Sequence, residues 1–274
     1  MPKMTADYTV SDLMASCIAH QVNDGDVVVQ GIATPLVMAA YLLAKRTHAR
    51  NIIFASAIGN AICSDWAPLS LSGIEDVWVG KALRQLTFPE IVCECLPTLK
   101  PKEFLRPAQI DPWGNTNNVA IGNYHRPRLR LPGCGGIADV TTYYDELYFY
   151  VPRHGRATFV KRLDFKSGLG VSLGGPGAAA KGRYLVSDLG TFDFNGGRLR
   201  LVTYHPGVTL ESIQAKTGFP LAIAPDLKET PAPTAEELRL LRQELDPLDI
   251  RSIECLSGPA RWARLREIAN LELS

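Results

Sequence analysis

The stretch NIIFASAIGNA, residues 51–61, has the pattern of a buried strand that ends in a turn. Strand ends are favoured positions for catalytic groups in α/β proteins, because ligands bind outside the carboxyl edge of a parallel sheet. Here the strand end presents only Ala55 and Ser56, and neither is an acid or a base. Nucleophilic attack by Ser56 requires an adjacent base, and none is evident nearby in the sequence.

A second stretch, RLPGCGGIADV at residues 130–140, places three glycines around Cys134. Such a loop brings backbone N–H groups close to a carbonyl or phosphate oxygen. It does not match the G-x-G-x-x-G motif, and the chain contains no Walker A motif. Cys134 is either a nucleophile or, more commonly for a lone cysteine between glycines, a small filler.

A third stretch, AQIDPWGNTNNVAIGNY at residues 108–124, is rich in turn-forming residues. Asp111 and Pro112 favour the start of a turn, Gly114 permits a positive φ, and the asparagines can satisfy loop backbone groups. This pattern predicts a tight hairpin or a turn that connects two strands.

Metal, nucleic-acid and membrane binding find little support in the sequence. The five histidines show no HxH or HxxxH spacing, so we predict no metal site. The basic run HRPRLRLP, residues 125–132, stands in a chain of net charge +1. It therefore favours a solvated face or contacts to a cofactor phosphate over nucleic-acid binding. No apolar run approaches the length of a membrane span.

The chain has 274 residues, enough to bury a sizeable core without disulfide bonds. Its six cysteines form no CxxC pair, which favours reduced thiols. The first residues lack the apolar core of a signal peptide. We therefore expect a soluble, cytoplasmic protein.

Elements that position the strand end begin with a βαβ unit. Residues 9–22 have helical spacing with Ser11 as a candidate N-cap, and residues 23–33 hold a strand. Residues 34–49 predict a helix with Thr34 as N-cap and Pro35 at its first position, and residues 50–56 predict the next strand. Such a unit implies parallel pairing and a right-handed crossover.

The rest of the chain holds more strands and then helices. The pattern of residues 209–219 predicts a helix that ends at Gly218. Residues 224–237 are proline-rich and predict a linker. Thr234 and Glu237 have the spacing of a capping box, which predicts the start of a helix over residues 235–245. We expect an α/β domain over residues 1–225 and a linker with a helical C-terminal tail over residues 226–274. Further strands are expected at residues 76–80, 146–152, 157–165, 183–194 and 199–206.

Taken together, five segments resemble the β subunit of the class I CoA-transferases, especially glutaconate CoA-transferase. The similarity runs over about residues 8–250, and its most specific part is the order of the Gln-Ile-Asp…Gly-Asn…Asn block and LPGCGG. The resemblance implies an open, mostly parallel sheet with helices on both faces. It also implies a separately encoded α subunit, a heterodimer or α2β2 assembly, and an active site at the α/β interface. The substrate would be a coenzyme A thioester, with no permanently bound cofactor. The matching segments are residues 22–54, 108–136, 186–194, 204–219 and 238–247.

In these transferases a glutamate within a Glu-Ser-Gly pattern stands at the strand end and carries CoA as an enzyme thioester. The matching positions here read Ala55-Ser56-Ala57. Ser56 is a poor replacement, because an acyl-serine ester is more stable than a thioester and its return to CoA would run uphill. The replacement of this glutamate by Ala55 therefore favours carbon–carbon bond cleavage over CoA transfer. The substrate would be a cyclic or carboxylated keto acyl-CoA of the steroid or aromatic catabolism type.

Two relatives of the family also lack this glutamate in the β subunit. One is the heteromeric hydrolase that opens the last steroid rings, in which the α subunit supplies a catalytic glutamate. Residues 163–170 and 186–197 here are similar to segments of that hydrolase. The other is a decarboxylase of 3-methylglutaconyl-CoA, which has a cysteine where this chain has Ser56, and that difference argues against decarboxylation.

Two other functions stay open. One is a glutaconate-type CoA-transferase whose glutamate lies elsewhere, with Glu75, Glu90 or Glu94 as stand-ins. The other is a non-catalytic subunit that stabilises an α partner. In the favoured hypothesis Ser56 is a polar contact to the reacting groups. The expected substrate- or CoA-binding residues are Ala55, Gln109, Asn115, Asn117, Gly133, Cys134, Gly135 and Gly136.

Overall fold

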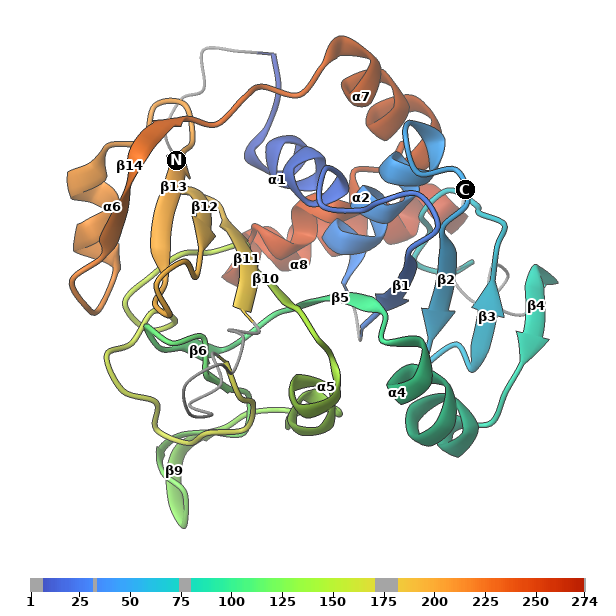
Figure 1. Cartoon of the computed structure of the whole chain (residues 1–274). Coiled ribbons are helices and arrows are strands. Elements are labelled where there is room, and N and C mark those ends of the chain that lie inside the picture. The colour runs from blue at the N-terminus through green and yellow to red at the C-terminus, as the bar shows by residue number, and fades with distance from the viewer. Residues whose placement is uncertain (1–6, 32–33, 74–79, 171–181, 274) are drawn as a thin grey trace. The chain divides into compact units, whose positions relative to one another are not determined.

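The computed structural model describes residues 7–31, 34–73, 80–170 and 182–273. The chain divides into two compact units. Figure 1 shows the whole chain, coloured by residue number from blue at the N-terminus to red at the C-terminus. The terminal unit comprises Ala6–Glu103 with Ala232–Ser274, and the central unit comprises Phe104–Pro231. The domain boundary expected at residue 225 stays a prediction. Within the described residues, no helix is both long enough and apolar enough to span a membrane.

The strands of the terminal unit contain the expected βαβ unit. β1 pairs in parallel with β2, so that Val29 lies opposite Ala55, and β1 also pairs in parallel with Lys102 and Glu103 of β5. β3 and β4 are antiparallel additions beyond β2, and β4 forms the edge. These strands are β1 (Val27–Gln30), β2 (Ile53–Ser56), β3 (Ala61–Cys63), β4 (Ala82–Gln85) and the first half of β5 (Lys102–Leu105).

Helices cover both faces of these strands. On one face, Ile91 and Leu96 pack in an apolar cluster with Val29 and Ala55. On the other face, α2 places the Nζ of Lys45 5.6 Å from the centroid of the Phe54 ring. The helical elements are α1 (Val10–Ala19), α2 (Pro35–Arg46), the π-helical η1 (Glu90–Cys95), α4 (Leu96–Leu99), α7 (Ala235–Arg239), η2 (Leu240–Leu245), η3 (Ile250–Glu254) and α8 (Gly258–Leu273).

Helix ends follow local capping, with one correction. The N-cap of α1 is Thr9 rather than Ser11, because Thr9 forms a reciprocal capping box with Asp12. The box that Thr234 and Glu237 form at α7 is confirmed. Thr34 precedes α2 as expected, but its side chain makes no capping bond. The carboxylate of Glu254, from η3, instead accepts the N–H of Leu36 at 2.9 Å.

The strands of the central unit continue with parallel and antiparallel pairs. β10 pairs in parallel with Phe104 and Leu105 of β5 and with β11, while β12 is antiparallel to both β11 and β13. β13 and β14 are parallel. Of the nine pairings among β1–β5 and β10–β14, five are parallel, which confirms the expected fold class. The further strands are β10 (Leu147–Val151), β11 (Gly182–Ser187), β12 (Gly190–Asp193), β13 (Arg200–Tyr204) and β14 (Ala222–Glu229).

Three expectations for this unit need correction. Residues 157–165 form no strand beyond an isolated bridge from Phe159 to Ile110. Residues 183–194 form two strands, because Ser187 Oγ accepts the N–H of Leu189 and closes a turn between them. The start of the expected linker lies in β14, whose backbone pairs with β13. Most of the strand expected at residues 76–80 lies outside the described residues.

Two short hairpins and two short helices complete the central unit. Ile137 and Val140 of α5 and Ile213 of α6 pack on a core that includes Phe149 and Phe192. The glycine-rich loop of residues 133–136 leads directly into α5. These elements are β6 (Gln109–Ile110), β7 (Thr116–Asn117), β8 (Ala120–Asn123), β9 (Arg126–Arg130), α5 (Ile137–Tyr143) and α6 (Leu210–Lys216).

Candidate functional site

Ala55 and Ser56 close strand β2 of the terminal unit, and both are buried. Ala55 packs in the apolar cluster with Ile91, whereas Ser56 points to the opposite face of the strand. The Oγ of Ser56 accepts the N–H of Gly59 at 2.9 Å and so closes the turn into β3. Within the described residues this is the only hydrogen bond of the Ser56 side chain. In the part of the chain that the structure describes, no base is therefore hydrogen-bonded to its hydroxyl.

Two of the three glutamates considered as substitutes, Glu90 and Glu94, lie within the described residues. Glu90 accepts the N–H and the hydroxyl of Thr87 at 2.6 and 2.7 Å, and these bonds hold the pKa of Glu90 below its usual range. The carboxylate thus holds Thr87 in the turn that leads into η1. Glu94 is exposed on η1, and Glu75 lies outside the described residues.

In the central unit, the turn-rich segment forms the predicted hairpin of β6 and β7, with Gln109 opposite Asn117. Asn117 is fully buried, and its Nδ2 donates to Gln109 Oε1 at 2.8 Å and to the carbonyl of Ala120 at 2.7 Å. These two amides therefore join the strands of the hairpin. Both are buried against protein, so in this structure they position the backbone.

The turn of this hairpin is organised by Asp111. Its carboxylate accepts the N–H groups of Trp113 and Asn115 and the Nδ2 of Asn115, at 2.9 to 3.0 Å. Burial raises the pKa of Asp111, and these hydrogen bonds act in the opposite direction. Gly114 has a φ of +76°, as the turn pattern predicted. Asn115 Oδ1 also accepts the N–H of Gly170 at 3.2 Å.

Asn118 connects the hairpin to the glycine loop. Its Oδ1 accepts the N–H of Ala108 at 2.6 Å, and its own N–H donates to Ser167 Oγ at 3.0 Å. The carbonyl oxygen of Asn118 accepts the N–H of Gly133 at 3.0 Å. The two distinctive sequence motifs are therefore parts of one hydrogen-bonded structure, because the hairpin holds the first residue of the loop.

The glycine loop has an unusual backbone. Gly133, Gly135 and Gly136 have φ of +114°, +53° and +91°, a region that L side chains rarely adopt. A β-carbon at Gly133 or Gly136 would meet no atom within 4 Å, so the loop is open there. Within the described residues, the N–H groups of Cys134, Gly135 and Gly136 donate to no acceptor. Consecutive free N–H groups in such a conformation form a concave site for an oxyanion.

Sequence reasoning missed how closely residues 163–170 pack on the hairpin. Asp164 Oδ2 accepts the Nε2 of Gln109 at 2.9 Å, and the N–H of Thr116 donates to the carbonyl of Gly168 at 3.0 Å. A β-carbon at Gly168 would lie 2.4 Å from Thr116 Oγ1, and one at Gly170 would lie 2.1 Å from a backbone oxygen. The alternate glycines of this segment were the available signal, since they indicate close backbone approach.

The model of the family described as Coenzyme A transferase matches residues 12–216, about three quarters of the chain. This range includes the strand end, the hairpin and the glycine loop. The chain belongs to the coenzyme A transferase family. The resemblance drawn from the sequence is thereby confirmed.

Relatives within the coenzyme A transferase family have names that indicate different reactions. The B subunit of glutaconate CoA-transferase from Acidaminococcus fermentans is 28% identical over 258 residues, 88% of this chain and 94% of that protein. The cholesterol ring-cleaving hydrolase IpdB subunit of Rhodococcus jostii is 36% identical over 152 residues, 53% of this chain and 60% of that protein. The crystal structure of the decarboxylase AibA/AibB is similar with a TM-score of 0.78 at 26% identity, over 90% of this chain and 98% of that one.

In this coenzyme A transferase family member, the predicted site residues fall into the two units. Gln109, Asn117 and the glycine loop belong to one hydrogen-bonded structure in the central unit. Asn115 joins that structure through Asp111 and Gly170. Ala55 and Ser56 belong to the terminal unit. The roles assigned to all of these residues in substrate binding stay predictions.

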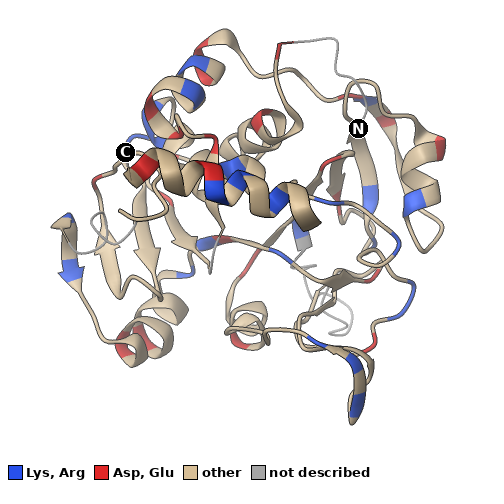
Figure 2. Ribbon diagram, turned by 180° about the vertical axis from the view of Figure 1, so that it is seen from behind, with Lys and Arg blue, Asp and Glu red and all other residues tan. Residues whose placement is uncertain are grey.

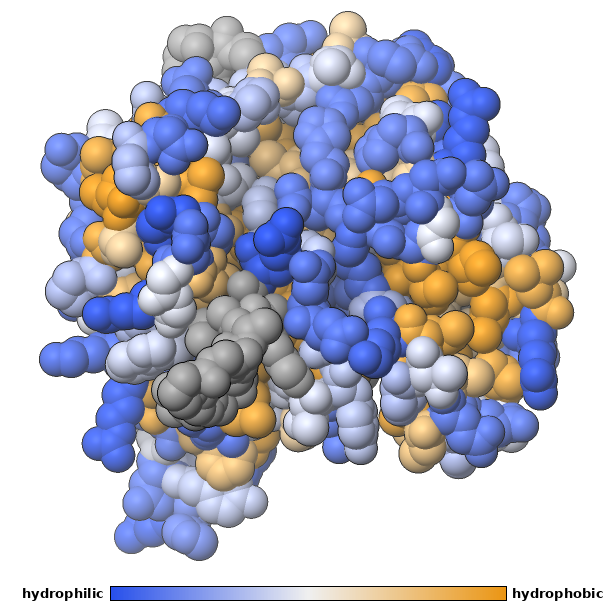
Figure 3. All heavy atoms as spheres, viewed as in Figure 1, coloured by the Kyte–Doolittle hydropathy of each residue, from blue (hydrophilic) through white to orange (hydrophobic). Residues whose placement is uncertain are grey.

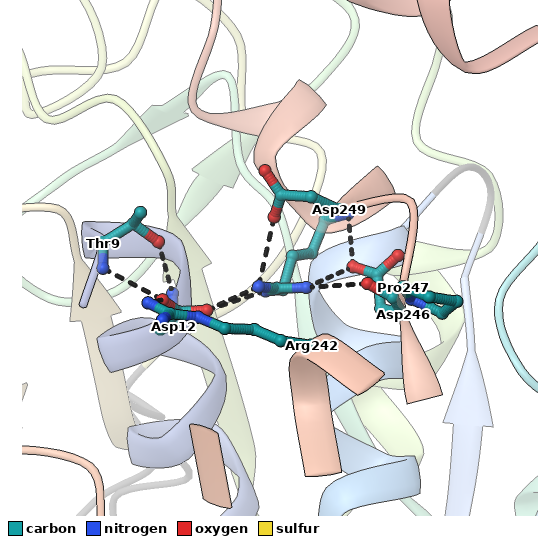
Figure 4. A pocket seen from close by; sticks show the side chains of 7 residues that line it. Thr9, Asp12, Arg242, Asp246, Pro247 and Asp249 are labelled. Atoms are coloured by element: carbon teal, nitrogen blue, oxygen red, sulfur yellow. Dashed lines mark hydrogen bonds and ion pairs between the residues drawn. The ribbon is translucent and has the colours of Figure 1, made fainter. Parts of the chain in front are cut away.

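A buried ion cluster fixes the segment that follows the part matched by the coenzyme A transferase model. Arg251 lies between Asp12 of α1 and Asp246, with its Nη1 2.7 Å from Asp246 Oδ2, and Arg242 pairs with Asp12 at 2.7 Å (Figure 4). Burial acts to raise the pKa of Asp12, but Arg251 and the hydrogen bonds lower it overall. The small cavity beside these groups, about 200 Å³, is thus lined by charged side chains that are already paired with one another.

A buried serine–histidine pair in the central unit has a structural role. His154 Nδ1 lies 3.0 Å from Ser187 Oγ, and its Nε2 lies 3.0 Å from Thr217 Oγ1. His205 contacts the carbonyl of Ser187 at 2.8 Å. Ser187 is completely buried, and the His154 ring is stacked on Phe159 with centroids 3.6 Å apart. No substrate reaches such a serine in this structure, so the pair joins β11 to its neighbours.

Proposed function

We propose that this chain is the β-type subunit of a heteromeric enzyme of the coenzyme A transferase family that cleaves a carbon–carbon bond of an acyl-CoA. The observation that carries the proposal is the alanine at position 55, which packs in an apolar cluster. In the resemblance drawn from the sequence, this is the position of the glutamate of the transferases. The names of the hydrolase and decarboxylase relatives support such a reaction. The substrate class is a cyclic or carboxylated keto acyl-CoA, and no permanently bound cofactor is needed.

The glycine loop suits this chemistry. In hydrolysis, water adds to a ketone carbonyl, and the bond between that carbon and the carbon next to the thioester breaks. The electron pair of this bond moves onto the thioester as an enolate, whose oxygen carries the negative charge. The free N–H groups of Cys134, Gly135 and Gly136 are suited to bind that oxygen. The enolate carbon then takes a proton.

The base that activates water must come from elsewhere, because Ser56 has no base beside it. We assign it to an α partner, since the relatives are subunits of enzymes with two kinds of chain. In this proposal the α subunit completes the site, in a heterodimer or an α2β2 assembly. A cytoplasmic location stays a prediction.

CoA transfer remains the second candidate, because similarity to the B subunit of glutaconate CoA-transferase extends over 88% of the chain. The two reactions differ in whether CoA becomes attached to the enzyme. The complex with its α subunit is given a keto acyl-CoA, with and without a free acceptor acid. We expect ring or chain cleavage that is independent of the acceptor, and no enzyme–CoA thioester on this chain by mass spectrometry.

Acceptor-dependent exchange with a trapped thioester would instead establish a transferase. The third candidate is a non-catalytic subunit, and it makes its own prediction. Full turnover by the α subunit alone would support that role and contradict ours.

A further inference from the structure

The hairpin of β8 and β9 in the central unit carries a local concentration of positive charge. Arg126, Arg128 and Arg130 all lie on β9, and residues 112–138 contain no Asp or Glu. The hairpin extends away from the other strands of its unit (Figure 1), and Figure 2 shows basic residues along it. The whole chain has a net charge of only +1, so this excess is local. Such a region attracts anionic ligands.

Two of these arginines are available for a ligand. Arg126 and Arg128 are exposed, and within the described residues their guanidinium groups form no hydrogen bond or ion pair. Arg128 is the extra residue of a β-bulge opposite Gly122. A bulge re-aims a side chain away from the regular ladder, and glycine on the partner strand leaves the space for it.

The third arginine is held in place and stiffens the hairpin. The guanidinium carbon of Arg130 lies 5.1 Å from the centroid of the Tyr124 ring, and its Nη2 donates to the Tyr124 carbonyl at 3.3 Å. Tyr124 in turn stacks on Phe165 with centroids 4.8 Å apart. Lys166 follows Phe165 directly, so a fourth cation adjoins the hairpin. The positive charge therefore lies on a hairpin whose conformation these contacts stabilise.

The hairpin leads without interruption into the glycine loop. Beyond Arg130, the N–H of Leu131 donates to Val119 and that of Gly133 to Asn118, each at 3.0 Å. An extended strand rises about 3.3 Å per residue, so the three arginines lie roughly 10 to 23 Å along the chain from the loop. The pantetheine arm of a coenzyme A thioester separates the thioester from the phosphates by a distance within this range.

We propose that the arginines of β9 bind the phosphate groups of the coenzyme A thioester while the glycine loop holds its thioester oxygen. This inference rests on the proposed function. Arginine suits the role, because its planar fork donates two parallel hydrogen bonds to a phosphate. Arg126 and Arg128 make the contacts, and Arg130 adds charge from its place on Tyr124. An acidic surface of a partner subunit is the competing occupant, and the continuity with the loop favours the substrate.

The test measures the affinity of the α/β complex for coenzyme A and for pantetheine, which lacks the phosphates, by calorimetry. The double variant Arg126→Gln/Arg128→Gln is expected to weaken coenzyme A binding about tenfold and to leave pantetheine binding within about twofold. The loss should shrink as salt is added, because screening weakens exposed charge pairs. The variant Arg126→Lys/Arg128→Lys should keep most of the affinity. Arg156→Gln, which removes another exposed arginine of this unit, serves as the control.

Three results would overturn the inference alone: unchanged coenzyme A affinity in the glutamine variant, an equal loss for both ligands, or dissociation of the complex. Dissociation would show that the arginines contact the partner subunit. If the unaltered complex binds neither coenzyme A nor pantetheine, the proposed function fails and the inference fails with it. Because binding is measured without turnover, these results do not depend on the identity of the acyl group.

Discussion

At Gly135 the backbone has a φ of +53°, which a β-branched residue adopts only with strain. Gly135→Val should therefore displace the free N–H groups of the loop. We expect turnover to fall about a hundredfold or more, the loss typical for removal of an oxyanion donor. The measurement is kcat of the complex, with assembly checked by gel filtration.

The control for this change is Gly25→Val, at another glycine of positive φ with open space around it. It imposes a comparable backbone strain in the turn before β1, so it should lower stability and leave kcat nearly unchanged. Turnover that survives Gly135→Val would remove the loop from the site.

A carboxylate introduced at position 55 should lower both stability and activity. Ala55 is completely buried beside Val29 and Ile91, so a glutamate there would place a charge in apolar surroundings. We expect Ala55→Glu to lower the melting temperature and to reduce activity at least tenfold. Ala55→Gln has nearly the same volume and no charge, so it should be less damaging if charge is the cause.

Ser56→Ala is the companion change at this strand end. It removes one hydrogen bond to Gly59, and its expected effect is a loss of about 1 kcal/mol in the free energy of unfolding with activity largely retained. Complete inactivation, together with an acyl-serine seen by mass spectrometry of the unaltered enzyme, would make Ser56 the nucleophile.

At the scale of elements, the β6–β7 hairpin depends on Asn117. Asn117→Asp keeps the shape but replaces the Nδ2 donor with an oxygen that faces Gln109 Oε1 and the Ala120 carbonyl. The expected loss in unfolding free energy is about 1–3 kcal/mol, because buried groups lose their partner. The glycine loop should also loosen, since Asn118 holds Gly133. Denaturant unfolding and hydrogen exchange at residues 133–136 measure the two effects.

An exposed asparagine provides the comparison for that change. Asn270→Asp alters the same groups on the exposed face of α8 in the terminal unit, and exposed substitutions usually change stability by less than about 0.5 kcal/mol. Equal effects of the two substitutions would mean that the buried amide pair does not support the hairpin.

The β11–β13 region should make stability depend on pH. Burial lowers the pKa of His154 to about 3 and that of His205 to about 4, so between these values and 6.5 the unfolded chain binds more protons than the folded chain. The contribution of these two histidines to the free energy of unfolding is therefore at its maximum above pH 6.5. It falls as the pH is lowered, by up to about 1.4 kcal/mol per pH unit for each histidine.

Asp188 opposes part of this trend. Burial raises its pKa to about 6, so its proton stabilises the folded state at low pH, and that contribution is lost as the pH rises through 6. Urea unfolding of the complex between pH 4 and 7 should show a flatter pH dependence for His205→Gln. The exposed His125→Gln should keep the original slope, and equal slopes for both variants would contradict the assignment.

At the scale of the whole molecule, the chain has an apolar surface that fits an assembly partner. Ile58, Leu83 and Phe88 of the terminal unit are 54%, 64% and 57% exposed. Leu83 lies on the edge strand β4, Phe88 follows that strand, and Ile58 lies in the turn between β2 and β3. Figure 3 shows apolar side chains gathered over this region. A large exposed apolar patch commonly marks a protein interface. We define these three residues as the edge patch.

We expect an α subunit to cover the edge patch. Leu83→Asp with Phe88→Asp should weaken assembly of the complex at least tenfold, measured by analytical ultracentrifugation, because each change buries a charge at the interface. Leu273→Asp, at another highly exposed leucine, should leave assembly unchanged. A chain that is a well-behaved monomer with full acyl-CoA activity on its own would contradict the prediction.

The sequence by itself determined the βαβ unit, the capping box at Thr234, the hairpin of residues 109–117 and the family. These features depend on local rules, such as turn residues, capping pairs and apolar spacing, which act over a few positions. The alanine at position 55 was likewise visible in the sequence, and its correspondence to the glutamate of the transferases stays a prediction. Local spacing also allowed errors, as at residues 157–165, where the apolar pattern of a strand led only to an isolated bridge.

Only the tertiary structure decided which distant residues act together. The Asn118 carbonyl joins the hairpin to Gly133, Glu254 caps the helix that begins at Pro35, and Arg251 neutralises Asp12 from the far end of the chain. No spacing rule predicts such pairs, because their partners are brought together by packing across more than a dozen to over two hundred residues. Ala232–Ser274 groups with Ala6–Glu103 in the terminal unit for the same reason.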